Sequence, residues 1–313
     1  MKITLLSLAI FWLCLSPGNM QLLHATAFDL PPPGENLVGN MQTVSTRYED
    51  TLLDIARRFD LGYEDIVLAN PQVDIWLPGE GTQVVLPNLF ILPDAPREGI
   101  VINLAEMRLY YYPKLESGNA SKQGVIVYPV SIGRQNWQTP IVLTRVTDKR
   151  ANPVWHPPAS ILKEHTADGY PLPDVVPSGP QNPLGLFALY LDLPQYLIHG
   201  TNKAFGIGMT VTHGCIRLYP EDIEALFQSV PLGTSVRIIN QPYKAGWRNG
   251  SLYLEVHPLL NGEAGKKDQG QASLTETIMM ATKSQPDYPV DWTRVLHIAR
   301  HPRGIPISIV KKP

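Results

Sequence analysis

One stretch, residues 199–218, constrains this chain more than any other. It carries two of the eight histidines and one of the two cysteines. His199 is followed by Gly200, and His213 lies two residues before Cys215. A cysteine thiol is a nucleophile only as the thiolate, and a nearby imidazole can take its proton. The clustering predicts a nucleophilic cysteine site, whereas the alternative interpretation is a buried structural cysteine with two packed histidines.

The first 27 residues have the features of a secretory signal peptide. An apolar run over 3–15 follows a charged residue and is too short to span a bilayer, and an A-x-A sequence ends at Ala27. Cleavage near Ala27 would remove Cys14 and leave Cys215 as the only cysteine. A thiol without a disulfide partner in an oxidising compartment favours a chemical role for Cys215.

Composition and changes of pattern divide the chain. The 313 residues are enough for two small domains or one large one, and a net charge of −2 gives no indication of a nucleic-acid partner. The 30 prolines and 24 glycines indicate many loops and short strands. We expect a signal peptide over 1–27, a linker over 28–40, a compact unit over 41–88, a linker over 89–97, a β-rich domain over 98–240 and an extension over 241–313.

Residues 41–88 have the pattern of a small α+β unit in the order strand, helix, helix, strand. The segment 52–59 has apolar residues at the i, i+3, i+4 and i+7 positions of a helix, with Asp50 or Thr51 as its N-cap. A second helix over 63–69 should end just before a proline, because the residue that precedes proline is disfavoured in a helix.

The next 143 residues, 98–240, have a mainly β pattern. A hairpin is predicted over 100–112 and a strand over 234–239, with a helix that begins at Pro220 between them. The segment 148–185 is irregular and rich in proline. A loop of this length in a compact domain is usually functional, so we expect it to border the cleft. The alternative is a surface excursion without substrate contact.

The stretch around Cys215 resembles the signature of the L,D-transpeptidase family, the cysteine enzymes with a YkuD-type catalytic domain that remodel bacterial peptidoglycan. That signature is His-Gly, a gap and Ser/Thr-His-Gly-Cys, which stands here as His199-Gly200 and Thr212-His213-Gly214-Cys215. Arg217 stands where many members have Asn, and members from Gram-negative bacteria often have Arg. The resemblance implies a mainly β catalytic domain, sandwich-like or barrel-like, behind the small α+β unit.

Two histidines compete for the role of general base to Cys215. The resemblance implies His199, with its second ring nitrogen held by a backbone carbonyl such as that of Gly200. His213 is nearer to Cys215 in sequence. Two positions along a strand, however, its Cα would lie about 6.5–7 Å from that of Cys215, and its side chain would lie beside the sulfur instead of facing it. A histidine on a neighbouring strand can face the sulfur, so we expect His199 to be the base and its loss to raise the thiol pKa.

The other motif residues take supporting roles by the same resemblance. Thr212 and His213 would orient the site and the substrate. Backbone N–H groups of Gly214 and Cys215 would bind the oxyanion, and Arg217 would hold a carboxylate of the substrate by paired hydrogen bonds. No metal and no organic cofactor is implied. His213 and Cys215 could ligate zinc, but no second pair of ligands at a typical spacing completes such a site.

The implied reaction is acyl transfer on peptidoglycan. Cys215 would attack the carbonyl of the third residue of a tetrapeptide stem, release D-alanine and form a thioester. An amine would then take the acyl group, either from another stem, which gives a 3-3 cross-link, or from the terminal lysine of an outer-membrane lipoprotein. The implied location is the periplasm, and the implied partner is peptidoglycan.

The flanking units have resemblances of their own. Residues 41–88 resemble a LysM module, a small fold that binds N-acetylglucosamine-containing glycans. The matching stretches are Asp50-Thr51-Leu52, Ile55-Ala56, Phe59, Asn70-Pro71 and Pro78-Gly79. Glu49 departs from the usual glycine at its position, and a helical spacer without a ligand is the alternative. Residues 241–313 resemble the C-terminal extension of LysM-bearing L,D-transpeptidases and are expected to pack on the catalytic domain.

Three other functions fit parts of the sequence. An L,D-carboxypeptidase would use the same thioester with water in place of the amine. A non-catalytic wall-binding protein would tolerate the loss of Cys215, which the intact set of histidines and cysteine argues against. A papain-like protease has its cysteine before its histidine and a Cys-Gly-x-Cys-Trp environment, neither of which occurs here.

Overall fold

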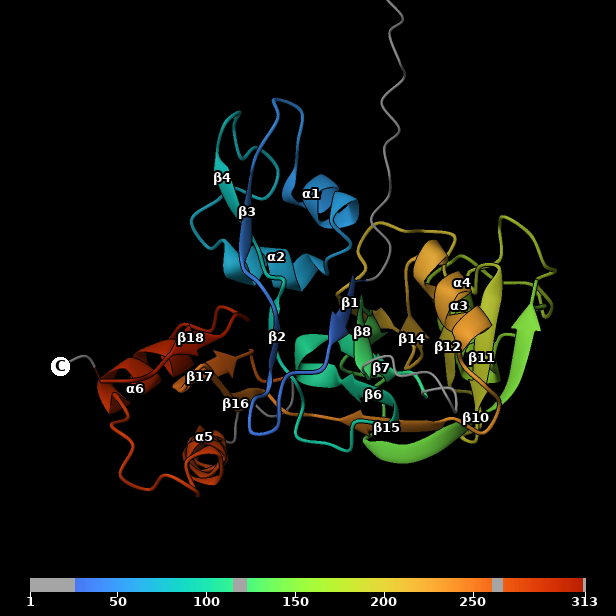
Figure 1. Cartoon of the computed structure of the whole chain (residues 1–313). Helices are drawn as coiled ribbons and strands as arrows, with labels where there is room; N and C mark the ends of the chain where they lie inside the picture. The colour runs from blue at the N-terminus through green and yellow to red at the C-terminus, as the bar shows by residue number, and fades with distance from the viewer. Residues whose placement is uncertain (1–25, 115–122, 261–266, 312–313) are drawn as a thin grey trace, which may run out of the picture.

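The computed structural model describes residues 26–114, 123–260 and 267–311. Figure 1 shows a small unit of two helices and a strand pair at the top, a curled sheet at the right, and a C-terminal unit at the lower left. The signal peptide predicted over 1–27 lies outside the described residues, except for its last two. Within those three ranges, no helix combines the length and apolar character needed to cross a membrane.

The small unit contains the elements β3 (Gln42–Ser45), α1 (Leu52–Arg58), α2 (Tyr63–Ala69) and β4 (Gln83–Leu86). Thr51 caps α1: its hydroxyl accepts from the Asp54 N–H at 3.1 Å, and the Asp54 carboxylate accepts from the Thr51 N–H at 3.0 Å. The Asn70 side chain joins the end of α2 to β4 through two hydrogen bonds with the Val85 backbone. The predicted strand–helix–helix–strand order is confirmed.

Nine strands form the main sheet in the order β1-β8-β7-β6-β15-β10-β11-β12-β14. Their bounds are β1 (Thr26–Asp29), β6 (Gly99–Asn103), β7 (Arg108–Tyr112), β8 (Gly124–Pro129), β10 (Val142–Ala151), β11 (Phe187–Leu191), β12 (Leu197–His199), β14 (Ile216–Arg217) and β15 (Ser235–Ile239). The predicted hairpin joins β6 to β7 through the 3-10 turn η1 (Leu104–Glu106). Neighbours are antiparallel except β6 with β15 and β12 with β14. The expectation of a mainly β domain is confirmed.

The core of the sheet domain lies inside its curl. The helix α4 (Pro220–Ser229) covers it with Ile223 and Leu226, which pack with strand residues such as Leu189 and Ile198. α4 begins at Pro220, as predicted, with the proline in the first turn where no intrahelical N–H bond is lost. A second small sheet pairs β9 (Ile132–Gly133) with β13 (Thr210–Thr212) in parallel and leads into the cysteine motif.

The segments expected to be linkers are parts of sheets instead. Residues 28–40 contain the end of β1, which pairs with β8, and β2 (Leu37–Gly39). β2 pairs with β5 (Leu89–Ile91), which lies in the second expected linker, 89–97. Their apolar side chains are buried. Proline-rich composition indicated spacers here, but these short strands bury enough apolar surface to hold the units against one another.

The segment 148–185 is only partly irregular, which corrects the prediction. β10 continues to Ala151, so the first four residues of the segment are a strand. The helix α3 (Ala159–Ala167) follows, and Trp155 forms an isolated β-bridge with Val176. The prolines of the segment flank α3 rather than exclude it, since a proline that precedes a helix removes no hydrogen bond from it.

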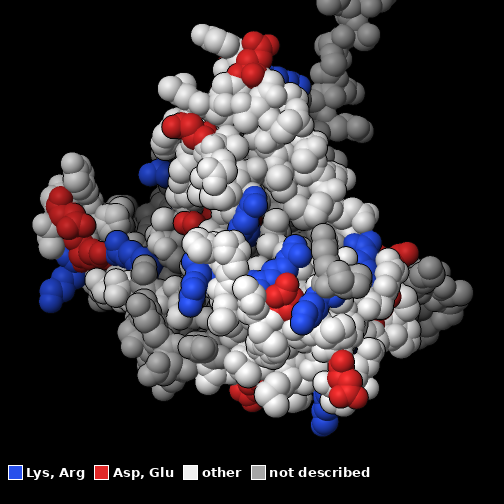
Figure 2. Space-filling model, turned by 90° about the vertical axis from the view of Figure 1, so that its left-hand side faces the viewer, with Lys and Arg blue, Asp and Glu red and all other residues white. Residues whose placement is uncertain are grey.

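The C-terminal unit contains β16 (Tyr243–Arg248), β17 (Ser251–Val256), α5 (Lys267–Ala281), α6 (Trp292–Arg300) and β18 (Ile307–Ser308). It has an apolar core of its own, to which Leu254 and Ile298 belong. The predicted cap of α6 is confirmed, because the Asp291 carboxylate accepts from the Arg294 N–H at 2.9 Å. Figure 2 looks at the side of the molecule on which this unit lies, and Lys and Arg side chains gather near the middle of the view.

A buried ion cluster joins the three units. Arg108 of β7 donates to Asp65 of α2 at 2.7 Å, to Glu106 of η1 at 3.0 Å and to Glu255 of β17 at 2.8 Å. Lys244 of β16 adds a contact of 2.6 Å to Glu106. Arg108, Glu106 and Glu255 are each at most 3% exposed. Because every charge in the cluster has a partner from another element, the cluster fixes the units relative to one another.

Replacing Arg108 by alanine should lower the free energy of unfolding by about 3–5 kcal/mol, because it leaves buried carboxylates without their partner. Arg145→Ala is the matched control: its pair with Asp192 is exposed, with side-chain exposures of 63% and 56%, and its loss should cost about 0–1 kcal/mol. Urea denaturation of the two variants measures both values. Similar losses in the two variants would contradict the importance of the cluster.

Candidate active site

The predicted nucleophile and base come from two adjacent strands. β12 and β14 pair in parallel, with His199 opposite Arg217. Cys215 immediately precedes β14 and lies two residues before Arg217, so the two side chains lie on the same side of the strand. The Leu218 N–H donates to the His199 carbonyl at 2.9 Å and extends the pairing. The strand register therefore brings together residues that are 16 and 18 positions apart in the sequence.

His199 is buried and neutral. Its Nδ1 lies 2.7 Å from the carbonyl oxygen of Gly200, the contact that the resemblance implied. A carbonyl only accepts a hydrogen bond, so Nδ1 carries the proton and Nε2 keeps its lone pair. Burial lowers the pKa of His199 to about 3, and the positive charge of Arg217 acts in the same direction. The imidazole is therefore held in one tautomer and in its basic form.

The Cys215 thiol is also neutral. Burial raises its pKa to about 11, against the opposing effects of the Leu197 backbone and of the positive charge of Arg217. The thiol donates to the Gln195 carbonyl at 3.5 Å, and no hydrogen bond among the described residues joins it to His199. The resting site is a thiol near a neutral imidazole. The expectation that loss of His199 raises the thiol pKa stays a prediction, because the effects that shift this pKa are burial, the Leu197 backbone and the charge of Arg217.

The turn before the cysteine is built on a glycine. Gly214 has φ +102°, a region that L side chains rarely adopt, and a Cβ there would lie 2.9 Å from the Tyr196 ring. The Thr212 hydroxyl donates to the Cys215 carbonyl at 2.6 Å and accepts from the Gly214 N–H at 3.2 Å. This turn corrects two expectations: the Gly214 N–H is engaged rather than free for an oxyanion, and His213 is not in a continuous strand with Cys215.

A threonine outside the motif fixes the same turn. The Thr139 hydroxyl donates to the Gly214 carbonyl at 2.9 Å and accepts from the Gly133 N–H at 3.0 Å. Thr139 therefore ties the cysteine turn to β9. The sequence alone assigned Thr139 no role.

His213 contacts side chains from distant parts of the sequence, and the sequence did not predict these contacts. Its Nε2 is 2.8 Å from a carboxylate oxygen of Glu164 on α3 and 3.0 Å from the guanidinium of Arg134. The Trp137 ring stands edge-on to the imidazole, with the ring centres 5.1 Å apart. The segment 148–185 therefore borders the cysteine motif, and the expectation that it borders a substrate cleft stays a prediction.

Arg217 is half-buried, and its Nε has no hydrogen-bond partner among the described residues. Burial lowers the pKa of Arg217, and the neighbouring Cys215 acts against that shift. The charge next to the thiol is thus partly unsatisfied. Such a guanidinium is suited to a carboxylate of a bound molecule, which would complete its hydrogen bonds.

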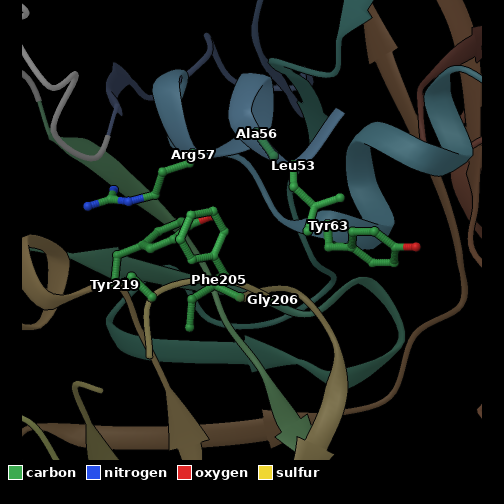
Figure 3. Close-up of a pocket in the computed structure, with 9 residues that line it drawn as sticks. Leu53, Ala56, Arg57, Tyr63, Phe205, Gly206 and Tyr219 are labelled. Atoms are coloured by element: carbon green, nitrogen blue, oxygen red, sulfur yellow. The ribbon is translucent and has the colours of Figure 1, made fainter. Parts of the chain in front are cut away.

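The small N-terminal unit packs against the connection between His199 and the cysteine turn. The N–H of Tyr63 donates to the Ile207 carbonyl of this connection at 2.8 Å, and beyond the cysteine the Tyr219 hydroxyl donates to the Leu61 carbonyl at 3.1 Å. A shallow pocket lies at this boundary (Figure 3), where Arg57 of α1 extends over the Tyr219 ring at 4.5 Å from its centre. The N-terminal unit therefore supports the loop that carries the site.

Two buried carboxyl groups meet at the same boundary. Asp60 follows α1, and Asp222 lies in the first turn of α4. Burial raises the pKa of Asp60 to about 7, and burial together with the charge of Asp60 raises the pKa of Asp222 well above its usual range. Two carboxylates this close cannot both ionise without a large cost, so at least one of them keeps its proton at neutral pH.

One group of side chains in the described ranges has the geometry of a metal site: Glu106, Glu255 and His257. Arg108 and Lys244 already satisfy these carboxylates within the ion cluster, at distances of 2.6–3.2 Å. A metal ion would have to displace two buried cations, so the donor set does not fit a metal. This group is remote in sequence from the cysteine motif.

Comparison with known proteins decides the family. The YkuD family profile, described as the L,D-transpeptidase catalytic domain, matches residues 97–238. Over 298 residues the chain is 43% identical to the protein named Probable L,D-transpeptidase YbiS of Escherichia coli (strain K12), covering 93% of this chain and 94% of that protein. The chain belongs to the L,D-transpeptidase family. It is therefore a transpeptidase enzyme.

Two further proteins extend the comparison of this L,D-transpeptidase. Probable L,D-transpeptidase ErfK/SrfK of Salmonella typhimurium is 42% identical over 290 residues, covering 91% of each chain. The NMR structure of the catalytic domain from E. faecium L,D-transpeptidase is 18% identical, with a TM-score of 0.34, and covers 47% of this chain and 100% of that one.

The alkylation of Cys215 by iodoacetamide should reflect the high pKa of the thiol in this transpeptidase. Thiolate forms only as the pH approaches the thiol pKa, so the rate should rise steadily from pH 7 to 10 without a plateau near neutrality. A neutral His199 contributes no charge, so His199→Ala should leave this profile nearly unchanged. A plateau at neutral pH that disappears in His199→Ala would instead indicate a thiolate–imidazolium pair.

Proposed function

We propose that this L,D-transpeptidase works through a thioester on Cys215, with peptidoglycan tetrapeptide stems as its substrate. The observation that carries the proposal is the placement of His199, whose Nδ1 is held by the Gly200 carbonyl on a strand paired with that of Cys215. This leaves Nε2 as a free base on the strand that pairs with β14, which Cys215 directly precedes, and Cys215 is the only free thiol among the described residues. No cofactor or metal enters the proposed reaction.

Acylation begins with proton transfer. Nε2 of His199 takes the thiol proton as Sγ of Cys215 attacks the carbonyl carbon of the third stem residue. The Cys215 N–H donates to the oxyanion that forms, since the Gly214 N–H is engaged by Thr212. The intermediate collapses, the C–N bond to D-alanine breaks, and His199 returns the proton to the departing amine. Arg217 holds a carboxylate of the stem during these steps.

Transfer to an acceptor repeats the steps in the opposite direction. An amine attacks the thioester carbon, His199 accepts a proton from that amine, and the C–S bond breaks to regenerate the Cys215 thiol. The acceptor is the amine of a second stem, which gives a 3-3 cross-link, or the lysine of an outer-membrane lipoprotein. Because burial keeps both resting groups neutral, no charge separation is required before substrate binds.

The remaining parts of the chain fit the same role. We infer that the small unit over 41–88 is a LysM module that binds the glycan strands, a proposal supported by its strand–helix–helix–strand order. Exposed apolar side chains on that unit, Tyr48, Trp76 and Leu77, are available for stacking on sugars. We further propose that residues 1–27 direct the chain to the periplasm, where these substrates occur.

Incubation of the purified chain with a disaccharide tetrapeptide, with and without a lysine-ended peptide, tests the proposal by mass spectrometry. We expect release of D-alanine in both cases, a 3-3 dimer without the peptide and a tripeptide–lysine adduct with it. Cys215→Ala should give none of these products. Free tripeptide alone would favour an L,D-carboxypeptidase, and the absence of D-alanine release would favour a wall-binding protein without catalysis.

A further inference from the structure

The segment between β10 and β11, residues 152–186, contacts both histidines of the site. Asn182 is fully buried and anchors the segment: its amide donates to the Pro153 carbonyl at 2.9 Å, and its oxygen accepts from the Leu184 N–H at 2.9 Å. The Leu184 backbone in turn lies at His199, where its carbonyl acts to raise the pKa of the imidazole. One end of the segment is thus fixed next to the proposed base.

The other end of the segment carries α3, and α3 brings a carboxylate to the second histidine. Glu164 lies 2.8 Å from Nε2 of His213, and Arg134 forms an ion pair with the same carboxylate. The Arg134 guanidinium is also 3.0 Å from Nε2 of His213. A carboxylate and a guanidinium therefore converge on one ring nitrogen of a histidine that lies two residues before the nucleophile.

The chemistry of the Glu164 carboxylate and the Arg134 guanidinium fixes which nitrogen of the His213 ring carries the proton. A carboxylate only accepts hydrogen bonds and a guanidinium only donates them. Facing Glu164, Nε2 carries the proton, whereas facing Arg134 alone it would be the acceptor. The shorter contact to Glu164, together with the pairing of Arg134 with that carboxylate, favours the proton on Nε2.

We propose that Glu164 is a positioning residue that holds His213 in the Nε2–H tautomer and leaves Nδ1 to accept a hydrogen bond from the substrate next to Cys215. Among the described residues, no hydrogen bond engages Nδ1 of His213. The kinetic part of this inference rests on the proposed function of Cys215. The tautomer does not rest on it.

The ring remains neutral, as this role requires. Burial lowers the pKa of His213, Glu164 acts against that shift, and Arg134 and His165 add to it. These groups come from both elements that face the ring: Glu164 and His165 from α3, and Arg134 from the loop after β9. A neutral ring with one fixed proton offers the substrate a lone pair of defined direction.

The tautomer of His213 can be read directly from long-range ¹H–¹⁵N spectra of the full chain labelled in histidine, with the signal assigned by its loss in His213→Gln. We expect the Nε2–H form in the wild type. In Glu164→Ala the Arg134 guanidinium remains as a donor to Nε2, so the proton should move to Nδ1. In Glu164→Gln the amide oxygen can still accept from Nε2–H, and the wild-type tautomer should persist.

The kinetic readout is D-alanine release from the disaccharide tetrapeptide. Glu164→Ala should lower kcat/KM about tenfold, as expected for the loss of one hydrogen bond between the substrate and Nδ1 of the neutral ring, and Glu164→Gln should recover most of that loss. Cys215 alkylation by iodoacetamide should change little in either variant. Glu224→Ala, at an exposed glutamate of α4, is the matched control and should alter neither the spectrum nor the rate.

Several outcomes would overturn the proposal. An Nδ1–H tautomer in the wild type, or an Nε2–H tautomer that persists in Glu164→Ala, would contradict the role of Glu164. A tautomer that switches without a change in kcat/KM would show that the position of the proton has no effect on the reaction. If the wild type releases no D-alanine, the proposed function fails, while the spectra still decide the tautomer.

Discussion

Arg108 is the residue on which the arrangement of the whole molecule depends. Its side chain is 1% exposed and contacts carboxylates from the N-terminal unit, the sheet domain and the C-terminal unit. A buried guanidinium is tolerated only when carboxylates neutralise its charge and accept its hydrogen bonds. Each of the three units supplies one of these carboxylates. The N-terminal unit is thereby fixed at a position from which Tyr63 supports the loop that leads to Cys215, and Leu61 contacts Tyr219 at the start of α4.

Burial also sets the chemistry of the site. It raises the pKa of the Cys215 thiol and lowers the pKa of His199, so both groups are neutral before substrate binds. The Gly200 carbonyl decides which nitrogen of His199 is the base, and Arg217 opposes a charge on that ring while favouring one on the sulfur. The positive charge of Arg217 stabilises the thiolate, but it also destabilises the imidazolium that forms when His199 takes the proton. The two effects partly cancel in the proton transfer from Cys215 to His199.

Local sequence patterns predicted much of the fold, and the family resemblance implied one contact of the candidate site. The strand–helix–helix–strand unit, the β6–β7 hairpin and the start of α4 depend on neighbouring residues, and each is present. The contact between His199 and the Gly200 carbonyl, which the resemblance implied, is also present. Contacts set by long-range packing were not predictable. Nothing in the sequence links Glu164 to His213 or Thr139 to Gly214, and residues 28–40 form strands only because distant partners exist. The thiol pKa likewise depends on burial that composition does not reveal.

Intact-protein mass spectrometry during a single turnover tests the central claim, that Cys215 is the nucleophile and neutral His199 its base. Mixing the chain with a tetrapeptide stem should add the mass of the tripeptide acyl group, on a peptide that contains Cys215. His199→Ala should form no adduct while its thiol still reacts with iodoacetamide at high pH. An acyl adduct on another residue, or an undiminished rate of adduct formation in His199→Ala, would contradict the account.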